Sequence, residues 1–251
     1  MLEEILERSK AIVVMAKVAK NILKEYNVPL EKINVVQHGC PDIPFLDSDN
    51  VKPSLGLKGR IVLSTFGLIN AGKGIEYAIQ ALPPLVEKHP NILYLVIGET
   101  HPEVRKIEGE TYRMSLIRLV DQLGLKNHVG FHNRFLTKRE LIRYLHATDI
   151  YITPYNGANQ ISSGTLVYAL GAGKAVVSTP YLHAKEVLSH GRGLFCDFRN
   201  PDSIALEVNK LLENKEMRRE MEKKAYRYSR SFTWPKVAQR YADIFKRAIK
   251  A

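Results

Sequence analysis

Short apolar runs alternate along the chain with longer segments in which apolar residues recur three and four positions apart. A short apolar run bounded by glycine or proline is typical of a buried strand, and the three-and-four spacing indicates an amphipathic helix. The expected strands are 11–15, 33–36, 61–66, 92–97, 129–132, 149–154, 175–178 and 193–196. The expected helices are 2–10, 16–26, 75–82, 111–123, 138–147, 165–172, 184–190, 201–213, 215–230 and 235–250. This alternation predicts an α/β fold with a doubly wound parallel sheet.

Two stretches interrupt the alternation. Residues 41–58 contain prolines, aspartates and serines without sustained periodicity, so we expect a linker there. Residues 99–108 are charged and are expected to form a loop. A domain with a regular strand–helix pattern is therefore expected to begin at about residue 59.

The clearest strand–loop–helix–strand unit spans residues 149–179. Its loop enters the expected helix 165–172 through Ser162, Ser163, Gly164 and Thr165. Hydroxyl side chains cap helices, and glycine lets a ligand approach the backbone closely. A helix N-terminus of this kind offers free N–H groups and the positive end of the helix dipole, which suits a phosphate group. An ordinary capped helix is the alternative.

A second candidate phosphate loop follows the expected strand 61–66. Lys73 lies there between Gly72 and Gly74, with Gly67 at the start of the loop. The spacing fits neither the P-loop nor the dinucleotide-binding glycine pattern. Ligands of parallel sheets bind at the carboxyl ends of strands, where this loop, 98–103 and 156–164 all lie. An exposed lysine beside a capped helix is the alternative interpretation.

The charge of the chain indicates an anionic partner. The 251 residues carry a formal net charge of +11, and the segment 215–251 has 12 Lys or Arg against 4 Asp or Glu. A phosphorylated ligand, an acidic membrane surface and nucleic acid would all satisfy such a charge. Recognition motifs for nucleic acid are lacking, so we expect none to bind. Cys40 and Cys196 are expected to be buried thiols of a cytoplasmic protein, and the acidic start is not typical of a signal peptide.

Four segments together resemble the donor-binding, C-terminal half of a GT-B glycosyltransferase of the retaining family 4 (group 1). Val35–Cys40 is similar to the family's interdomain turn v-i-p-n-G-v, and Phe66–Gly74 to its G-R-L-x-x-x-K-G loop. Residues 147–154 resemble a-a-D-v-f-v-l-P-S. Residues 171–179, with Glu186 beyond, resemble A-x-G-x-P-V-V-A-T followed by P-E-V-V. The order and spacing of these segments carry the resemblance, which covers roughly residues 33–245.

The resemblance implies a division of the chain into four parts. Residues 1–40 would be the remnant of an N-terminal acceptor domain with its hinge, and 41–58 the linker. Residues 59–234 would form the Rossmann-like domain that binds a nucleotide sugar. Residues 235–251 would form a helix that packs back toward the N-terminal segment. Such a chain would need a missing N-terminal domain or a partner chain.

The resemblance also implies roles for matching residues. Lys73 would neutralise the donor diphosphate and Gln160 would contact the transferred sugar, which makes these the expected catalytic residues. His38 and His132 could also face the cleft, although a structural role is the commoner meaning for each. Glu186 could hold a sugar or ribose, and a charge at a helix entrance is an equally open interpretation. The expected donor-binding residues are Gly67, Gly72, Gly74, Ser162, Ser163, Gly164, Thr165, Tyr168, Arg134 and Tyr155.

The chain departs from the family pattern at three positions. Leu68 stands where the family usually has an arginine, and Gln160 and Tyr168 stand where it usually has glutamates. Another cation, Arg134 or Lys174, could replace the charge of the arginine. Gln160 can still hydrogen-bond a sugar hydroxyl without a charge.

The expected function is retaining transfer of a sugar from a nucleoside diphosphate to an unidentified acceptor, in the hexosyltransferase class. No cofactor or metal is expected, because enzymes of this fold generally bind the diphosphate without one and the nucleotide sugar is a substrate. The protein would be cytoplasmic, with peripheral contact at the anionic inner face of the membrane. A binding module that has lost its chemistry is the alternative, and a sugar-nucleotide epimerase of the same fold is a further one.

Overall fold

The computed structural model of the protein describes residues 2–250. Residues 1 and 251, which belong to the predicted terminal segments, lie outside that range. Six parallel strands form the main sheet, in the order β5-β4-β3-β6-β7-β8, and β1 and β2 form a separate two-stranded parallel sheet. The strands are β1 (Ile12–Val14), β2 (Ile33–Val35), β3 (Ile61–Phe66), β4 (Ile92–Ile97), β5 (Val129–His132), β6 (Ile150–Thr153), β7 (Ala175–Ser178) and β8 (Leu194–Phe195).

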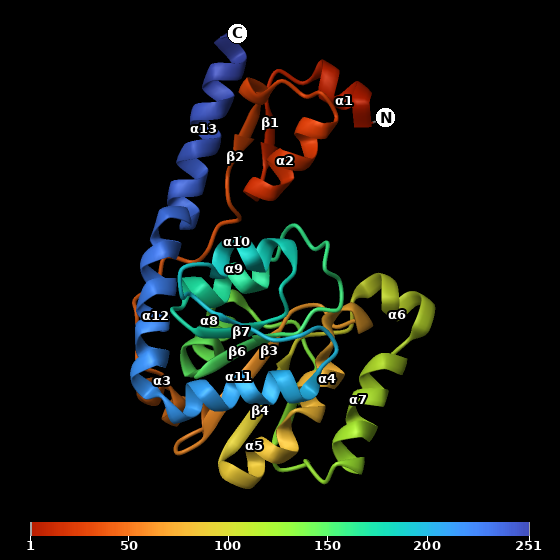
Figure 1. Ribbon diagram of the computed structural model, residues 1–251, viewed down its shortest axis with the longest axis vertical. Helices are drawn as coiled ribbons and strands as arrows, with labels where there is room; N and C mark the ends of the chain where they lie inside the picture. The colour runs from red at the N-terminus through yellow and green to blue at the C-terminus, as the bar shows by residue number, and fades with distance from the viewer. Residues whose placement is uncertain (1, 251) are drawn as a thin grey trace.

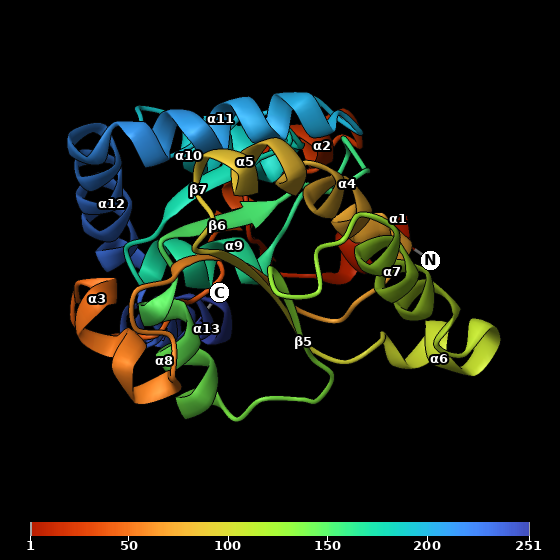
Figure 2. The same cartoon turned by 90° about the horizontal axis from the view of Figure 1, so that it is seen from below.

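Helices cover both faces of the main sheet, as Figure 2 shows for α5 and α11 on one side and α8 on the other. The helices are α1 (Leu2–Arg8), α2 (Lys17–Glu25), α3 (Ser48–Val51), α4 (Ile75–Gln80), α5 (Leu82–Lys88), α6 (Pro102–Glu108), α7 (Thr111–Gln122), α8 (Lys138–Ala147), α9 (Gly164–Gly171), α10 (Leu182–Leu188), α11 (Pro201–Glu213), α12 (Lys215–Ser229) and α13 (Trp234–Lys250). Single 3-10 turns are η1 (Leu30–Lys32), η2 (Lys52–Leu55), η3 (Ala71–Lys73) and η4 (Arg230–Phe232). The predicted doubly wound parallel sheet is confirmed.

Two apolar cores lie against the two faces of the sheet. One joins the strands to α4, α5, α7 and α11, and it includes Ile79, Leu116 and Val208. The other joins them to α8, α9, α10 and α12, and it includes Leu145 and Leu170. Burial on both faces explains why the central strands do not alternate between apolar and polar residues; the hydroxyls of Ser64 and Thr65 in β3 are buried and hydrogen-bonded.

The small sheet β1–β2 lies apart from the main sheet, and α13 runs along one side of the molecule from the end of α12 up past the small sheet (Figure 1). Val237 and Ile244 of α13 pack in one cluster with Val36 and with half-buried Val13. On its exposed face α13 carries Phe245 and Ile249. Contact of this helix with an anionic membrane stays a prediction. None of the described helices is long and apolar enough to cross a bilayer.

The structure corrects the loop prediction for residues 99–108. Helix α6 occupies Pro102–Glu108 and buries none of its residues, so it leaves no apolar periodicity in the sequence. Its start depends on local chemistry instead. Pro102 stands in the first turn, and the His101 ring accepts the Glu103 N–H at 3.2 Å.

The segment 41–58, predicted as a linker, contains α3 and η2 and is tied to the main sheet by a buried ion pair. The Lys52 Nζ lies 2.8 Å from the Asp149 carboxylate, and both side chains are nearly inaccessible. Asp149 also accepts the Val62 N–H at 2.7 Å and the Ser48 hydroxyl at 2.6 Å. The aspartate of the family-like segment 147–154 is therefore an anchor between segments.

Candidate functional site

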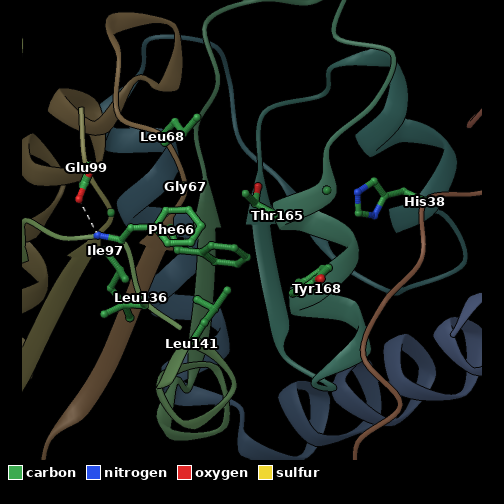
Figure 3. A pocket seen from close by; sticks show the side chains of 13 residues that line it. His38, Phe66, Gly67, Leu68, Ile97, Glu99, Leu136, Leu141, Thr165 and Tyr168 are labelled. Carbon is green, nitrogen blue, oxygen red and sulfur yellow. Dashed lines mark hydrogen bonds between the residues drawn. The ribbon is translucent and has the colours of Figure 1, made fainter. Parts of the chain in front are cut away.

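A cavity of about 380 Å³ opens at the carboxyl ends of β3 and β4, beside the first turn of α9 (Figure 3). Strand order reverses between β3 and β6, because β4 lies on one side of β3 and β6 on the other. Open α/β sheets bind their ligands at this switch point. The cavity is lined by His38, Phe66, Gly67, Leu68, Ile97, Gly98, Glu99, Phe135, Leu136, Leu141, Gly164, Thr165 and Tyr168.

Glycines let the loops behind this cavity approach one another. Gly98 has φ +133°, and a Cβ placed on it would stand 2.1 Å from the Gly67 carbonyl oxygen. Gly74, at φ +62°, leads into α4, and a Cβ there would stand 2.1 Å from the Pro154 oxygen. Neither position accepts a larger residue without moving backbone. Gly74 therefore has a packing role and does not line the cavity.

The N-terminus of α9 faces the cavity through Gly164 and Thr165. The Ser163 side chain caps the helix by accepting the Leu166 N–H at 3.3 Å, as the sequence predicts. The Ser163 N–H itself donates to His183 Nδ1 at 3.0 Å. Within residues 2–250, no protein acceptor takes the N–H groups of Gly164 and Thr165. Two backbone donors at the positive end of a helix are thus free to bind an anion.

Lys73 lies next to this turn but does not line the cavity. Its Nζ donates to the Tyr155 hydroxyl at 2.8 Å, and that hydroxyl lies 2.9 Å from Thr165 Oγ1. Burial raises the pKa of Tyr155. The Lys73 ammonium and the hydrogen bonds from Lys73, Ser163 and Thr165 lower it by more, so the pKa lies below its usual value. Two hydrogen bonds therefore connect the Lys73 ammonium to the Thr165 hydroxyl, with the Tyr155 hydroxyl between them.

Only some of the remaining predicted site residues line the cavity. Tyr168 lines it, and its hydroxyl accepts the Trp234 Nε1–H at 3.2 Å. Gln160 is exposed and donates to the Ser162 carbonyl in the loop before α9. Arg134 is exposed and pairs with Glu140 at 2.7 Å. Gly72 lies in η3. Their assignment as donor-binding or catalytic residues stays a prediction.

Glu186 and Lys174, both considered as possible site residues, have other partners in the structure. The Glu186 carboxylate accepts the N–H groups of Lys17 and Val18, at 2.8 and 3.3 Å. It thus caps α2 and connects the N-terminal segment to α10. Lys174 directly precedes β7 at the amino edge of the sheet, opposite the cavity, and its Nζ donates to the His146 carbonyl at 3.0 Å. Lys174 therefore cannot replace the charge absent at Leu68.

The sequence analysis missed part of the cavity wall. Glu99, in a loop recognised as a candidate, holds the loop after β5 by accepting the Phe135 N–H at 3.0 Å. Phe135 is 76% exposed, and with the buried Leu136 it forms a short apolar pair between polar segments, which was the available signal in the sequence. His38 lines the cavity, whereas His132 packs on Tyr144 at 4.7 Å between ring centres.

Within residues 2–250, no three His, Cys, Asp or Glu side chains form a group that could hold a metal ion. Asp47 and Asp49 have an Asp-x-Asp spacing, but Asp47 caps α3 and Asp49 pairs with Lys52. Cys40 and Cys196 are free and buried, as predicted, and burial raises the pKa of Cys40 to about 11.

Lys174→Met is expected to stabilise the fold at neutral pH by about 1–3 kcal/mol. Burial lowers the pKa of Lys174 to about 8, although Glu222 and Asp149 oppose the shift. The unfolded chain therefore binds more protons than the folded one between about pH 8 and 10.5, and wild-type stability rises with pH in that window. The advantage of the variant should shrink across the same window. Urea unfolding at pH 7 and pH 10 measures it, and a less stable variant at pH 7 would contradict the prediction.

The sequence model of the family described as glycosyl transferases group 1 matches residues 47–228, more than half of the chain. The chain belongs to this family. It is 27% identical over 253 residues to an uncharacterized glycosyltransferase of Methanocaldococcus jannaschii, covering 98% of this chain and 60% of the relative. It is 24% identical to the spore coat protein SA of Bacillus subtilis, covering 79% of this chain and 52% of the relative.

Solved structures confirm the fold. Anabaena HepE, crystallised with UDP and glucose, superposes with a TM-score of 0.79 at 18% identity, over 96% of this chain and 64% of that one. Sucrose-phosphate synthase from Thermosynechococcus elongatus gives 0.83 at 17% identity, over 99% and 61%. The group 1 chain thus has the fold of the C-terminal half of a GT-B glycosyltransferase. It spans about half to two thirds of the length of these relatives.

Proposed function

We propose that this chain is the nucleotide-sugar-binding half of a retaining glycosyltransferase of the hexosyltransferase class. The observation that carries the proposal is the cavity at the switch point of the sheet, into which Gly164 and Thr165 present free N–H groups. Family membership and the UDP complex of the similar HepE structure support a nucleoside diphosphate sugar as the ligand. The acceptor would bind to the missing N-terminal half.

In the proposed complex the donor diphosphate lies at the start of α9. Gly164 and Thr165 donate backbone N–H groups to it, and Lys73 supplies positive charge through Tyr155 and Thr165. When the sugar leaves, negative charge accumulates on the departing diphosphate. Donors that are already in place stabilise that charge without reorganisation, which lowers the barrier to transfer. The Gln160 amide, in the loop that precedes α9, would hydrogen-bond the transferred sugar.

Lys73→Ala is expected to weaken binding of the nucleotide sugar by more than tenfold, or about 1.4 kcal/mol. The reason is the loss of the cation that polarises the Tyr155–Thr165 pair. Calorimetric titration with UDP, GDP and ADP and their sugars measures the effect and identifies the base. Lys88→Ala is the matched control. Lys88 is exposed at the end of α5, just before the start of β4, whereas the cavity lies at the carboxyl end of β4. Equal affinity of Lys73→Ala and wild type would remove Lys73 from the site.

The alternative, a binding module without chemistry, shares the same cavity and predicts the same binding. Release of free sugar from the donor separates the two. We expect slow donor hydrolysis, or transfer, once the chain is combined with an N-terminal half from a relative. Tight donor binding with neither reaction would favour the non-catalytic module.

A further inference from the structure

Among the described residues that line the cavity, His38 is the one whose side chain can carry a positive charge. No lysine or arginine lines it, and Glu99 contributes a carboxylate to the opposite wall. A nucleoside diphosphate that enters this cavity meets Lys73 only indirectly, through Tyr155. The cavity therefore holds a single place where an ion pair with a phosphate could form directly.

The ring of His38 is held in one orientation. Its Nδ1 lies 2.8 Å from the Gly39 carbonyl oxygen. Because a carbonyl can only accept, Nδ1 carries a hydrogen, and Nε2 is the atom that gains or loses the second proton. The Trp234 ring packs edge-on at 5.3 Å between centres, and the Tyr168 ring lies at 6.2 Å. The imidazole is thus positioned before any ligand arrives.

Nε2 of His38 points at the first residue of α9. A Cβ placed on Gly164 would stand 2.9 Å from this nitrogen, so only glycine lets the ring lie against the helix start. Figure 3 shows the ring beside the first turn of α9. Nε2 of His38 therefore lies against the same helix start that carries the free N–H groups of Gly164 and Thr165.

The groups around His38 do not compete for this proton. From α10, His183 accepts the Ser163 N–H on Nδ1, and burial together with the nearby His38 lowers the pKa of His183 to about 4. His183 is therefore neutral at physiological pH. From α9 and α13, Tyr168 and Trp234 are uncharged. Glu99 lies on the opposite wall of the cavity.

We propose that His38 binds the donor diphosphate through a protonated Nε2, so that nucleotide-sugar binding takes up a proton. This inference rests on the proposed function and adds a phosphate ligand to it. By linkage, a ligand that favours the protonated imidazole binds more tightly as the pH falls. The bond is an ion pair in a partly enclosed site, where charge-assisted hydrogen bonds are strong.

His38→Asn and the control His190→Asn test the proposal by calorimetry. Asparagine can still donate to the Gly39 carbonyl but cannot be charged, and His190 is exposed in the turn that follows α10. UDP-glucose, GDP-mannose and ADP-glucose are titrated with the matching nucleosides uridine, guanosine and adenosine. The diphosphates of the three sugar nucleotides are esterified at both ends and do not titrate near neutrality. Any pH dependence of the affinity therefore comes from the protein.

We expect His38→Asn to weaken binding of the sugar nucleotide about tenfold at about pH 6 and less at about pH 8, with nucleoside binding unchanged. Titration of the wild type in buffers of different ionisation enthalpy should report proton uptake, which the variant lacks and His190→Asn keeps. Equal losses for nucleoside and sugar nucleotide, or proton uptake that persists in His38→Asn, would overturn the proposal while leaving the donor site intact. Failure of every sugar nucleotide to bind the wild type would instead overturn the proposed function, and this inference with it.

Discussion

Asp149→Ala is expected to destabilise the fold by about 3–5 kcal/mol, because it leaves the buried Lys52 ammonium without its main counter-charge. The side chains of Lys52 and Asp149 are 5% and 6% exposed, so water cannot replace the lost contact. The substitution also leaves the Val62 N–H, deep in the sheet, without an acceptor. An unpaired buried donor by itself lowers the free energy of unfolding by about 1–3 kcal/mol, so it is one source of the expected loss.

Urea unfolding followed by circular dichroism measures the effect. Asp49→Ala is the matched control, since Asp49 contacts the same ammonium at 2.7 Å but is 81% exposed. An exposed pair contributes only about 0–1 kcal/mol. If Asp149→Ala does not fold, Asp149→Asn keeps the shape and one carbonyl acceptor and should show a smaller loss. Equal effects of the Asp149 and Asp49 variants would show that burial does not set the strength of this pair.

Gly98→Ala is expected to cost about 2–4 kcal/mol and to abolish nucleotide binding. The added methyl group would stand 2.1 Å from the Gly67 oxygen, in a backbone conformation that side chains rarely adopt. Relief of the clash must separate the ends of β3 and β4, which form one wall of the cavity. Stability and binding should therefore fall together.

Gly124→Ala is the control that separates the effect of backbone strain from the effect of a steric clash. Gly124 also has a positive φ, +68°, but a Cβ there would meet nothing within 4 Å. It should lose about 1 kcal/mol and keep its affinity for nucleotide. Thermal melting and calorimetry on the two variants make the comparison. A Gly98→Ala protein with normal affinity would show that the cavity wall tolerates the separation.

Local patterns in the chain were sufficient for the architecture. The apolar runs at 61–66, 92–97, 129–132 and 175–178 match β3, β4, β5 and β7 residue for residue. Ser163 was recognisable as a helix cap because a cap depends on a hydrogen bond only three residues away. The loops after β3, β4 and β6 were predictable as well, since parallel strands bring their carboxyl ends to one edge, whereas the loop after β5 was not recognised.

Contacts between distant segments depended on the tertiary structure. Lys52 and Asp149 are 97 residues apart, and Glu186 caps a helix 169 residues before it. No periodicity records such pairs, because periodicity reports which face of an element is apolar and not which element faces it. Lys174 is an example. It follows a glycine in the sequence and was considered as a phosphate-binding cation, but it lies at the edge of the sheet opposite the cavity.

His38 shows the same division. The sequence alone places it in a turn after a strand, where a structural role is the commoner meaning. The cavity reaches it only because the chain returns at Phe232–Trp234, where Cys40 pairs with Thr233 and Trp234 packs beside the ring. Secondary structure, the Ser163 cap and the position of the loops at the carboxyl edge of the sheet follow from interactions within about one turn or one strand of the chain. Which charges meet there follows from strand order and packing, and those are properties of the whole fold.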